Sequence, residues 1–216
     1  MKIKRNKNGI KLGRLCEHYF HQPRFRVCET AIQCLGGCGF CKDYPLEQYL
    51  RDAKIMSLYE GTNGVQSIDL MGRKMTIRDD APFNAFKSEI DLFCEKHLEH
   101  PELGDRVRAL AEVGKRLWKA AGELKNRMTN DPLQWASHTY PALIAFGEVA
   151  MAWCLLDLAI IAHPSSRKKG KESDFYKGKV LQATFFDDTN LHHTLATIET
   201  CCRHGREIVE IPDNAF

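Results

Sequence analysis

The sequence lacks any segment in which apolar and polar residues alternate, and it lacks an internal repeat of about 20–50 residues. The first absence argues against half-buried strands, and the second excludes solenoids and propellers. Apolar residues instead recur at steps of three and four, which predicts helices. The clearest stripe comprises Leu103, Val107, Leu110, Val113, Leu117, Ala121 and Leu124. We therefore expect an all-α fold built as an antiparallel helical bundle.

The sequence also lacks an uninterrupted apolar run long enough to cross a membrane. Its longest apolar stretch, residues 144–161, contains Glu148 and Asp157. Each of these charges costs about 2.5–3.5 kcal/mol near the centre of a bilayer. The stretch is therefore interpreted as a buried helix, and no membrane span is expected.

No apolar leader precedes the basic first residues, and the nine cysteines are an odd number, so a secreted disulfide framework is not indicated. We expect reduced thiols in a cytoplasm. The net charge of +3 comes from bases that are interleaved with acids except at the ends of the chain. No continuous footprint for nucleic acid is present.

Residues 1–24 form an atypical basic segment, with no acid before Glu17 and no sustained period. We expect this segment to be a solvated tail, at least partly disordered. A first helical unit is predicted over residues 25–78 and a second over 79–216, joined by a charged linker. Helices are expected at 25–35, from Leu46 to Gly61, from Thr62 to Met75, and at about 83–98, 103–129, 132–163 and 173–207.

Three ordered blocks lie in the first unit: AIQ-x-x-GG-x-G-F at 31–40, EQYLRDAKI at 47–55 and YEGTNG-x-Q at 59–66. Their content and spacing resemble the carboxyl-terminal bundle of the acyl-CoA dehydrogenases. The second unit resembles the extra carboxyl-terminal domain of the larger members, which act on substrates such as methylthiopropionyl-CoA. The family's amino-terminal helical domain and middle β domain have no counterpart in this sequence, so the chain resembles a truncated carboxyl-terminal portion.

The paired glycines of the first block let backbone amides approach a phosphate closely, and a glutamine amide adds a directional contact. In the family this loop faces the FAD of a neighbouring protomer. The resemblance therefore implies that FAD is the cofactor and that the chain forms a homo-oligomer or pairs with a full-length homologue. The loop residues are Gln33, Cys34, Leu35, Gly36 and Gly37.

Glu60 stands before Gly61, where a broken helix would let a carboxylate project into a cavity. By resemblance, Glu60 removes the α-proton of an acyl-CoA while a hydride leaves the β-carbon for FAD. The Glu60 amide would donate a hydrogen bond to the thioester oxygen. The same resemblance places Thr62, Asn63 and Gly64 against the adenosine half of FAD, and it implies an electron-transfer flavoprotein or similar acceptor.

Two other interpretations of the sequence differ in class from this one. Cys34, Cys38 and Cys41 follow the C-x3-C-x2-C pattern of radical S-adenosylmethionine enzymes, whose thiolates hold an iron–sulfur cluster. That pattern explains only the cysteines and one phenylalanine, so no metal is assigned; adventitious zinc or no role is equally open for Cys38 and Cys41. The chain could also be a non-catalytic helical module that pairs with a full-length homologue. Arg51 and Asp52 are interpreted as a structural ion pair.

Overall fold

The computed structural model describes residues 12–170, 172–203 and 206–215, with side chains from Pro23 onward. Every regular element in these residues is helical, which confirms the predicted all-α fold. The longer helices are α1 (Leu12–Leu35), α3 (Leu46–Ile55), α5 (Ala81–His97), α6 (Gly104–Asn130), α7 (Pro132–Ser166) and α8 (Ser173–Cys202). The short elements are α2 (Gly37–Phe40), α4 (Asn63–Ile68), η1 (Asp69–Lys74), α9 (Glu207–Glu210) and η2 (Asp213–Ala215).

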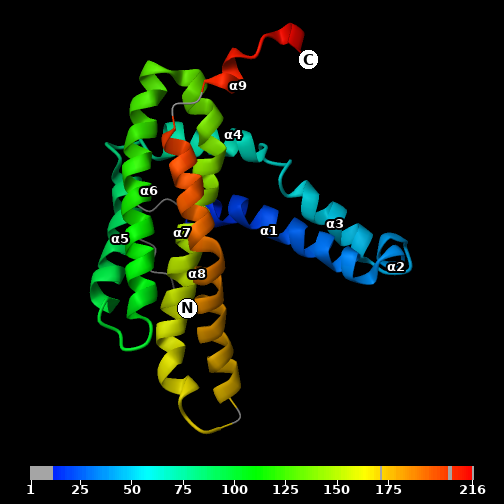
Figure 1. Cartoon of the computed structure of the whole chain (residues 1–216), viewed down its shortest axis with the longest axis vertical. Coiled ribbons are helices and arrows are strands. Elements are labelled where there is room, and N and C mark those ends of the chain that lie inside the picture. Colours follow the sequence, from blue (N-terminus) through cyan, green and yellow to red (C-terminus); the bar gives the residue numbers. More distant parts are fainter. Residues whose placement is uncertain (1–11, 171, 204–205, 216) are drawn as a thin grey trace.

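Helices α5 to α8 form an elongated bundle, and α1, α2 and α3 form an arm that points away from it (Figure 1). The apolar stripe predicted on α6 is buried in the bundle, with Val107 and Leu110 at 0% exposure. Phe86 from α5, Trp118 from α6 and Phe146 from α7 meet in this core. The four bundle helices begin close to where the sequence predicted, because burial of one face imposes the helical period on the sequence.

Helix α7 is the central helix of the molecule and packs against α8, α6, α1 and α4. By length and composition it is the one helix of the described residues that could cross a membrane. Val149, Ala152 and Leu156 nevertheless have 0% exposure, because neighbouring helices cover them. Alanines along α7 allow this close approach on several sides. The packing therefore favours the interpretation of α7 as the core helix of a bundle.

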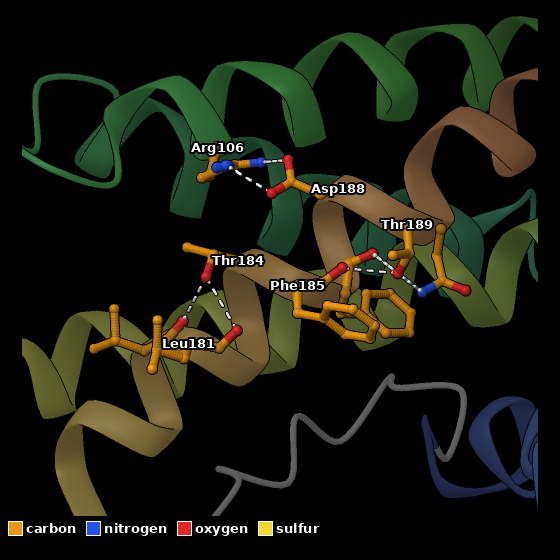
Figure 2. Close-up of polar contacts among 9 residues, drawn as sticks. Arg106, Leu181, Thr184, Phe185, Asp188 and Thr189 are labelled. Atoms are coloured by element: carbon orange, nitrogen blue, oxygen red, sulfur yellow. Dashed lines mark hydrogen bonds and ion pairs between the residues drawn. The ribbon is translucent and has the colours of Figure 1, made fainter. Parts of the chain in front are cut away.

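Polar contacts fix how α8 sits against the rest of the bundle. Arg106 on α6 makes a two-pronged ion pair with Asp188 on α8 (Figure 2). At the carboxyl-terminal end of α8, the buried guanidinium of Arg127 donates to the carbonyl oxygens of Cys201 (2.8 Å), Cys202 (2.6 Å) and Arg203 (3.1 Å). The last carbonyls of a helix have no partner within the helix, so Arg127 satisfies them and ends α8.

The segment expected to be a solvated, at least partly disordered tail is helical from Leu12, where α1 begins. Pro23 lies inside this helix. None of the described side chains of α1 is buried, so the segment carries no strong apolar stripe that a sequence pattern could reveal. The part of this prediction that concerns residues 1–11 lies outside the described residues.

The arm differs from the predicted pattern in a second place. Helix α3 ends at Ile55, not near Gly61, and residues 56–60 form turns. The third predicted helix is present as α4, and it continues into the π-helical η1. Helix α4 is tied to α7 by the buried hydroxyls of Ser67 and Thr139, which are 3.0 Å apart. The segment that carries Glu60 is therefore anchored to the bundle on its carboxyl-terminal side.

Candidate functional site

Glu60 lies on the turn between α3 and α4, in the left-handed backbone conformation with φ of 56°. Gly61 follows with φ of 93°. The side-chain amide of Gln66 on α4 donates to the carbonyl oxygen of Glu60 at 2.5 Å, which closes the turn. Left-handed geometry is unfavourable for a residue with a Cβ, so the surrounding contacts must hold Glu60 in place.

The residues around Glu60 build the same turn. The Thr62 hydroxyl accepts from the Val65 N–H at 3.4 Å and caps α4. The Asn63 N–H donates to the Ser57 carbonyl at 3.3 Å. A Cβ on Gly61 would lie only 3.1 Å from the Gln66 amide nitrogen, so a side chain there would disturb the contact that closes the turn. The YEGTNG-x-Q block therefore encodes a specific backbone path.

The carboxylate of Glu60 is exposed on this chain, and within the described residues it has no hydrogen bond or ion pair. Apolar neighbours are exposed with it: Leu58 is 51%, Tyr59 41% and Val65 57% exposed. Such surroundings would exclude water from the carboxylate only if another surface covered them. On its own, the chain presents this base at an uncovered apolar surface.

A cavity of about 480 Å³ lies beside the turn, lined by residues of α1, α3, α4 and α7. Its lining includes Ser57 and Asn63, on either side of Glu60 in the sequence, but not Glu60 itself. Asn63 is half-buried, and its side-chain oxygen is shielded from solvent without a hydrogen-bond partner. Thr62 and Gly64 are exposed. Of the three residues assigned to adenosine, Asn63 is the one that lines this cavity.

The glycine loop lies at the other end of α3, at the tip of the arm (Figure 1). Gln33, Cys34, Leu35, Gly36 and Gly37 are all exposed there. Gly36 has φ of 59°, and a Cβ built on Gly36 or Gly37 would meet nothing within 4 Å. The ten residues of α3 span about 15 Å, so the structure does not bring this loop and Glu60 together on one chain.

Two smaller predictions concern side chains of the same arm. Cys34, Cys38 and Cys41 are exposed and free. In the part of the chain that the structure describes, no group of three or more cysteine, histidine or acidic residues could hold a metal ion. The cluster interpretation thus gains no support. The predicted pair of Arg51 with Asp52 was wrong, because Arg51 instead pairs with Glu47, one helical turn away on α3, at 3.4 Å.

Comparison with known proteins assigns both helical units. The family described as "Acetyl-CoA dehydrogenase C-terminal like" matches residues 86–212, more than half of the chain. The family described as "Acyl-CoA dehydrogenase, C-terminal domain" matches residues 6–75. The chain belongs to the acyl-CoA dehydrogenase family. The acyl-CoA dehydrogenase match begins at residue 6, well before Phe25, where the sequence motifs alone placed the start of the resemblance.

Individual acyl-CoA dehydrogenases match over most of this chain. The broad-specificity linear acyl-CoA dehydrogenase FadE5 of Mycobacterium tuberculosis is 32% identical over 86% of the chain and 32% of its own length. A butyryl-CoA dehydrogenase of Syntrophomonas wolfei is 28% identical over 94% of the chain and 33% of its own length. The 3-methylmercaptopropionyl-CoA dehydrogenase of Ruegeria pomeroyi is 28% identical over 83% of the chain and 30% of its length. The chain spans about a third of these acyl-CoA dehydrogenases.

Sequence reasoning missed two features of this acyl-CoA dehydrogenase chain. The role of Gln66 in holding Glu60 was not foreseen, although the glutamine is part of the third block. Asp187 on α8 is 3% exposed, neither of its carboxylate oxygens has a hydrogen-bond partner, and burial raises its pKa to about 7. Its neighbour Asp188 takes the Arg106 contact instead. The Asp-Asp pair gives no signal of which carboxylate points inward.

Proposed function

We propose that this chain supplies the proton-abstracting carboxylate, Glu60, to an acyl-CoA dehydrogenase site whose remaining walls come from residues outside it. The observation that carries the proposal is the Glu60 turn: a non-glycine residue held at φ of 56°, closed by Gln66 on its own carbonyl. Strained backbone that is held by surrounding contacts is typical of functional positions. The motif and a strained turn that is closed by a side-chain contact thus coincide at Glu60.

The described residues fit FAD at two separate places. The open backbone at Gly36 and Gly37 leaves space for a pyrophosphate, and Gln33 is exposed beside it. At the other end of α3, Asn63 lines the cavity beside the Glu60 turn, where the resemblance places the adenosine half of FAD. Because the two places lie at opposite ends of α3, they would contact two different FAD molecules, and one of these would be bound together with a neighbouring protomer. When bound, FAD accepts the hydride that leaves the β-carbon of the substrate.

The residues of the turn would act on the acyl-CoA itself. The Glu60 carboxylate would take the α-proton. This requires a carboxylate oxygen within about 2.6–3.2 Å of the α-carbon that carries the proton. The backbone N–H of Glu60 would donate to the thioester oxygen and stabilise the negative charge that develops there. Covering Leu58, Tyr59 and Val65 with the other walls of the site would exclude water from the base. An electron-transfer flavoprotein or similar acceptor in the cytoplasm would then take the electrons from the reduced flavin.

The test joins this chain to the part that it lacks. The chain is co-expressed with the amino-terminal two thirds of one of its butyryl-CoA dehydrogenase relatives, and flavin absorbance and α-proton exchange of butyryl-CoA in deuterated water are measured. Glu60→Gln should reduce exchange by about 10³-fold or more while the flavin stays bound, because the base is lost at constant size. Asp52→Asn, an exposed carboxylate on α3, is the control and should leave exchange unchanged. Exchange retained by Glu60→Gln would contradict the assignment.

A second function, a non-catalytic module that pairs with a full-length homologue, is favoured by one observation. The arm exposes large apolar side chains, with Val27 at 68% and Phe40 at 77%, and α3 buries none of its residues. Exposed apolar faces of this kind mark association surfaces. A colourless chain that binds a full-length homologue without changing its turnover would support the module, whereas stoichiometric FAD in the complex would support the enzyme.

A further inference from the structure

Cys38 and Cys41 stand one helical turn apart at the tip of the arm. Cys38 lies in α2, and Cys41 is its C-cap, whose N–H donates to the Gly37 carbonyl at 3.3 Å. In such a turn the Cα atoms of residues i and i+3 are about 5 Å apart. Disulfides join Cα atoms that are roughly 4.4–6.8 Å apart. The backbone therefore already has the spacing of a disulfide.

Gly39, between the two cysteines, lies on the side of the turn that packs against α1. It is buried, and a Cβ at this position would lie 2.8 Å from the Ile32 carbonyl oxygen. The turn thus rests directly on α1 through a residue without a side chain. Cys38 and Cys41 are both exposed and free, so a small oxidant can reach either sulfur.

The remaining described cysteines lie in different environments. Burial raises the pKa values of Cys94 and Cys201 to about 12, which keeps those thiols protonated and unreactive. Burial also raises the pKa of Cys202. Cys34 is exposed on the same tip, but it lies in the last turn of α1, whereas Cys38 and Cys41 share the next turn. Accessibility and spacing coincide only at Cys38 and Cys41 among the described cysteines.

We infer that Cys38 and Cys41 form a redox-active dithiol, which a low-molecular-weight disulfide converts to an intramolecular disulfide. One thiolate attacks the oxidant, forming a mixed disulfide and releasing one small thiolate. The second thiolate attacks the protein sulfur of that mixed disulfide and releases the second small thiolate. The protein loses two protons and two electrons, and the oxidant is reduced to two thiols. A dithiol reductant reverses the step.

The position of the pair gives this chemistry a consequence that rests on the proposed function. Gly37, the second glycine of the flavin loop, directly precedes Cys38 in the same turn. A disulfide restrains this turn, so the thiol redox state would bear on how the Gly36-Gly37 backbone adapts to a pyrophosphate. Formation of the bond itself does not require flavin, so the two proposals are tested separately.

The experiment equilibrates the chain with oxidised and reduced glutathione at a series of ratios. Free thiols are blocked with one alkylating reagent, and disulfides are then reduced and labelled with a second. Trypsin releases residues 27–42, a peptide with Cys28, Cys34, Cys38 and Cys41. Tandem mass spectrometry should find the second label on Cys38 and Cys41 together, with the first label kept by Cys28 and Cys34.

Matched variants test each part of the inference. Cys41→Ser should stop the reaction at the mixed disulfide of Cys38 with glutathione, and Cys38→Ser should abolish the intramolecular bond. Cys34→Ser, on the same tip, should leave the bond and its midpoint unchanged. The inference is overturned if Cys38 and Cys41 keep the first label at every glutathione ratio, or if Cys34 takes a place in the disulfide. Far-ultraviolet circular dichroism of each variant verifies that the helices persist.

Discussion

At the scale of single residues, Glu60 occupies a backbone conformation that costs a residue with a Cβ about 1–2 kcal/mol. Glu60→Gly removes this strain, although glycine adds entropy to the unfolded chain. We expect the free energy of unfolding to rise by about 0.5 kcal/mol, as measured by urea denaturation. Glu112→Gly, at an exposed position of α6, is the control and should lose about 1 kcal/mol. A loss of the same size in Glu60→Gly would show that the turn is not strained.

Because of Asp187, the free energy of unfolding should fall as the pH rises. Its folded-state pKa of about 7 lies above the ordinary value of 3.8 because the carboxyl group is buried. The stability that its bound proton provides is fully present below about pH 4 and is lost as the pH rises through about 7. Asp187→Asn should therefore gain stability over the unchanged chain as the pH rises, and this gain should be larger at pH 8 than at pH 5 by on the order of 2 kcal/mol.

Urea denaturation at pH 5 and pH 8 checks this prediction, and Asp188→Asn is the control. The hydrogen bond from Arg106 lowers the pKa of Asp188, so its stabilising effect is present above its ordinary pKa and is lost on acidification. Removing Asp188 should therefore weaken the fold at both pH values. If the stability difference between Asp187→Asn and the unchanged chain were the same at pH 5 and pH 8, the Asp187 carboxyl would already be ionised in the folded chain at pH 5.

The candidate site could be predicted only in part. The YEGTNG-x-Q block placed Glu60 on a turn before a new helix, and the structure has that turn. The inward direction of the Asn63 side chain and the contact from Gln66 to the Glu60 carbonyl could not be foreseen. Both depend on the exact backbone path through two left-handed residues, which a motif names but does not describe.

At the scale of elements, the helices that bury a face were predicted closely and those of the arm were not. Helices α5, α6 and α7 begin and end within about three residues of expectation, whereas α8 ends at Cys202 and not near 207. Helix α1 extends back to Leu12 with no buried described side chain, so its sequence carries little periodic signal. Periodicity reveals a helix through what the helix buries.

The end of α8 depends on Arg127. Its guanidinium is 8% exposed and donates to three carbonyl oxygens in residues 201–203. Arg127→Met keeps much of the apolar volume but leaves these buried acceptors without donors, so we expect a loss of about 2–4 kcal/mol in the free energy of unfolding. Arg116→Met, with an exposed side chain on the same helix, should change it by less than about 0.5 kcal/mol. Thermal and urea unfolding measure both variants. Equal losses in the free energy of unfolding would contradict this role of Arg127.

At the scale of the whole molecule, the bundle and the arm differ in how much they bury. Most core residues lie in α5 to α8, whereas α3 has no buried residue. Regions with few buried contacts open more readily than a packed core. Hydrogen exchange followed by mass spectrometry should therefore show amides of α1 and α3 exchanging at least tenfold faster than those of α6 and α7. Adding the amino-terminal two thirds of a relative should slow the arm and leave α6 unchanged.

The direction of the arm could not be predicted from the sequence. Between η1 and α5, three successive residues, Arg78, Asp79 and Asp80, adopt positive φ. Asp80 then forms an ion pair with Lys125 on α6 at 2.5 Å. The angle between arm and bundle follows from such contacts between residues distant in sequence, which local patterns do not contain.

The length of α3 has a consequence for how this protein can change during evolution. The helix separates the glycine loop from Glu60, and each added residue would lengthen it by about 1.5 Å and rotate its two ends by about 100° relative to each other. A single insertion or deletion would therefore change how the loop and Glu60 face relative to each other, even if both motifs stayed intact. Under the proposed function, substitutions along the exposed face of α3 would be tolerated, but changes in its residue count would not.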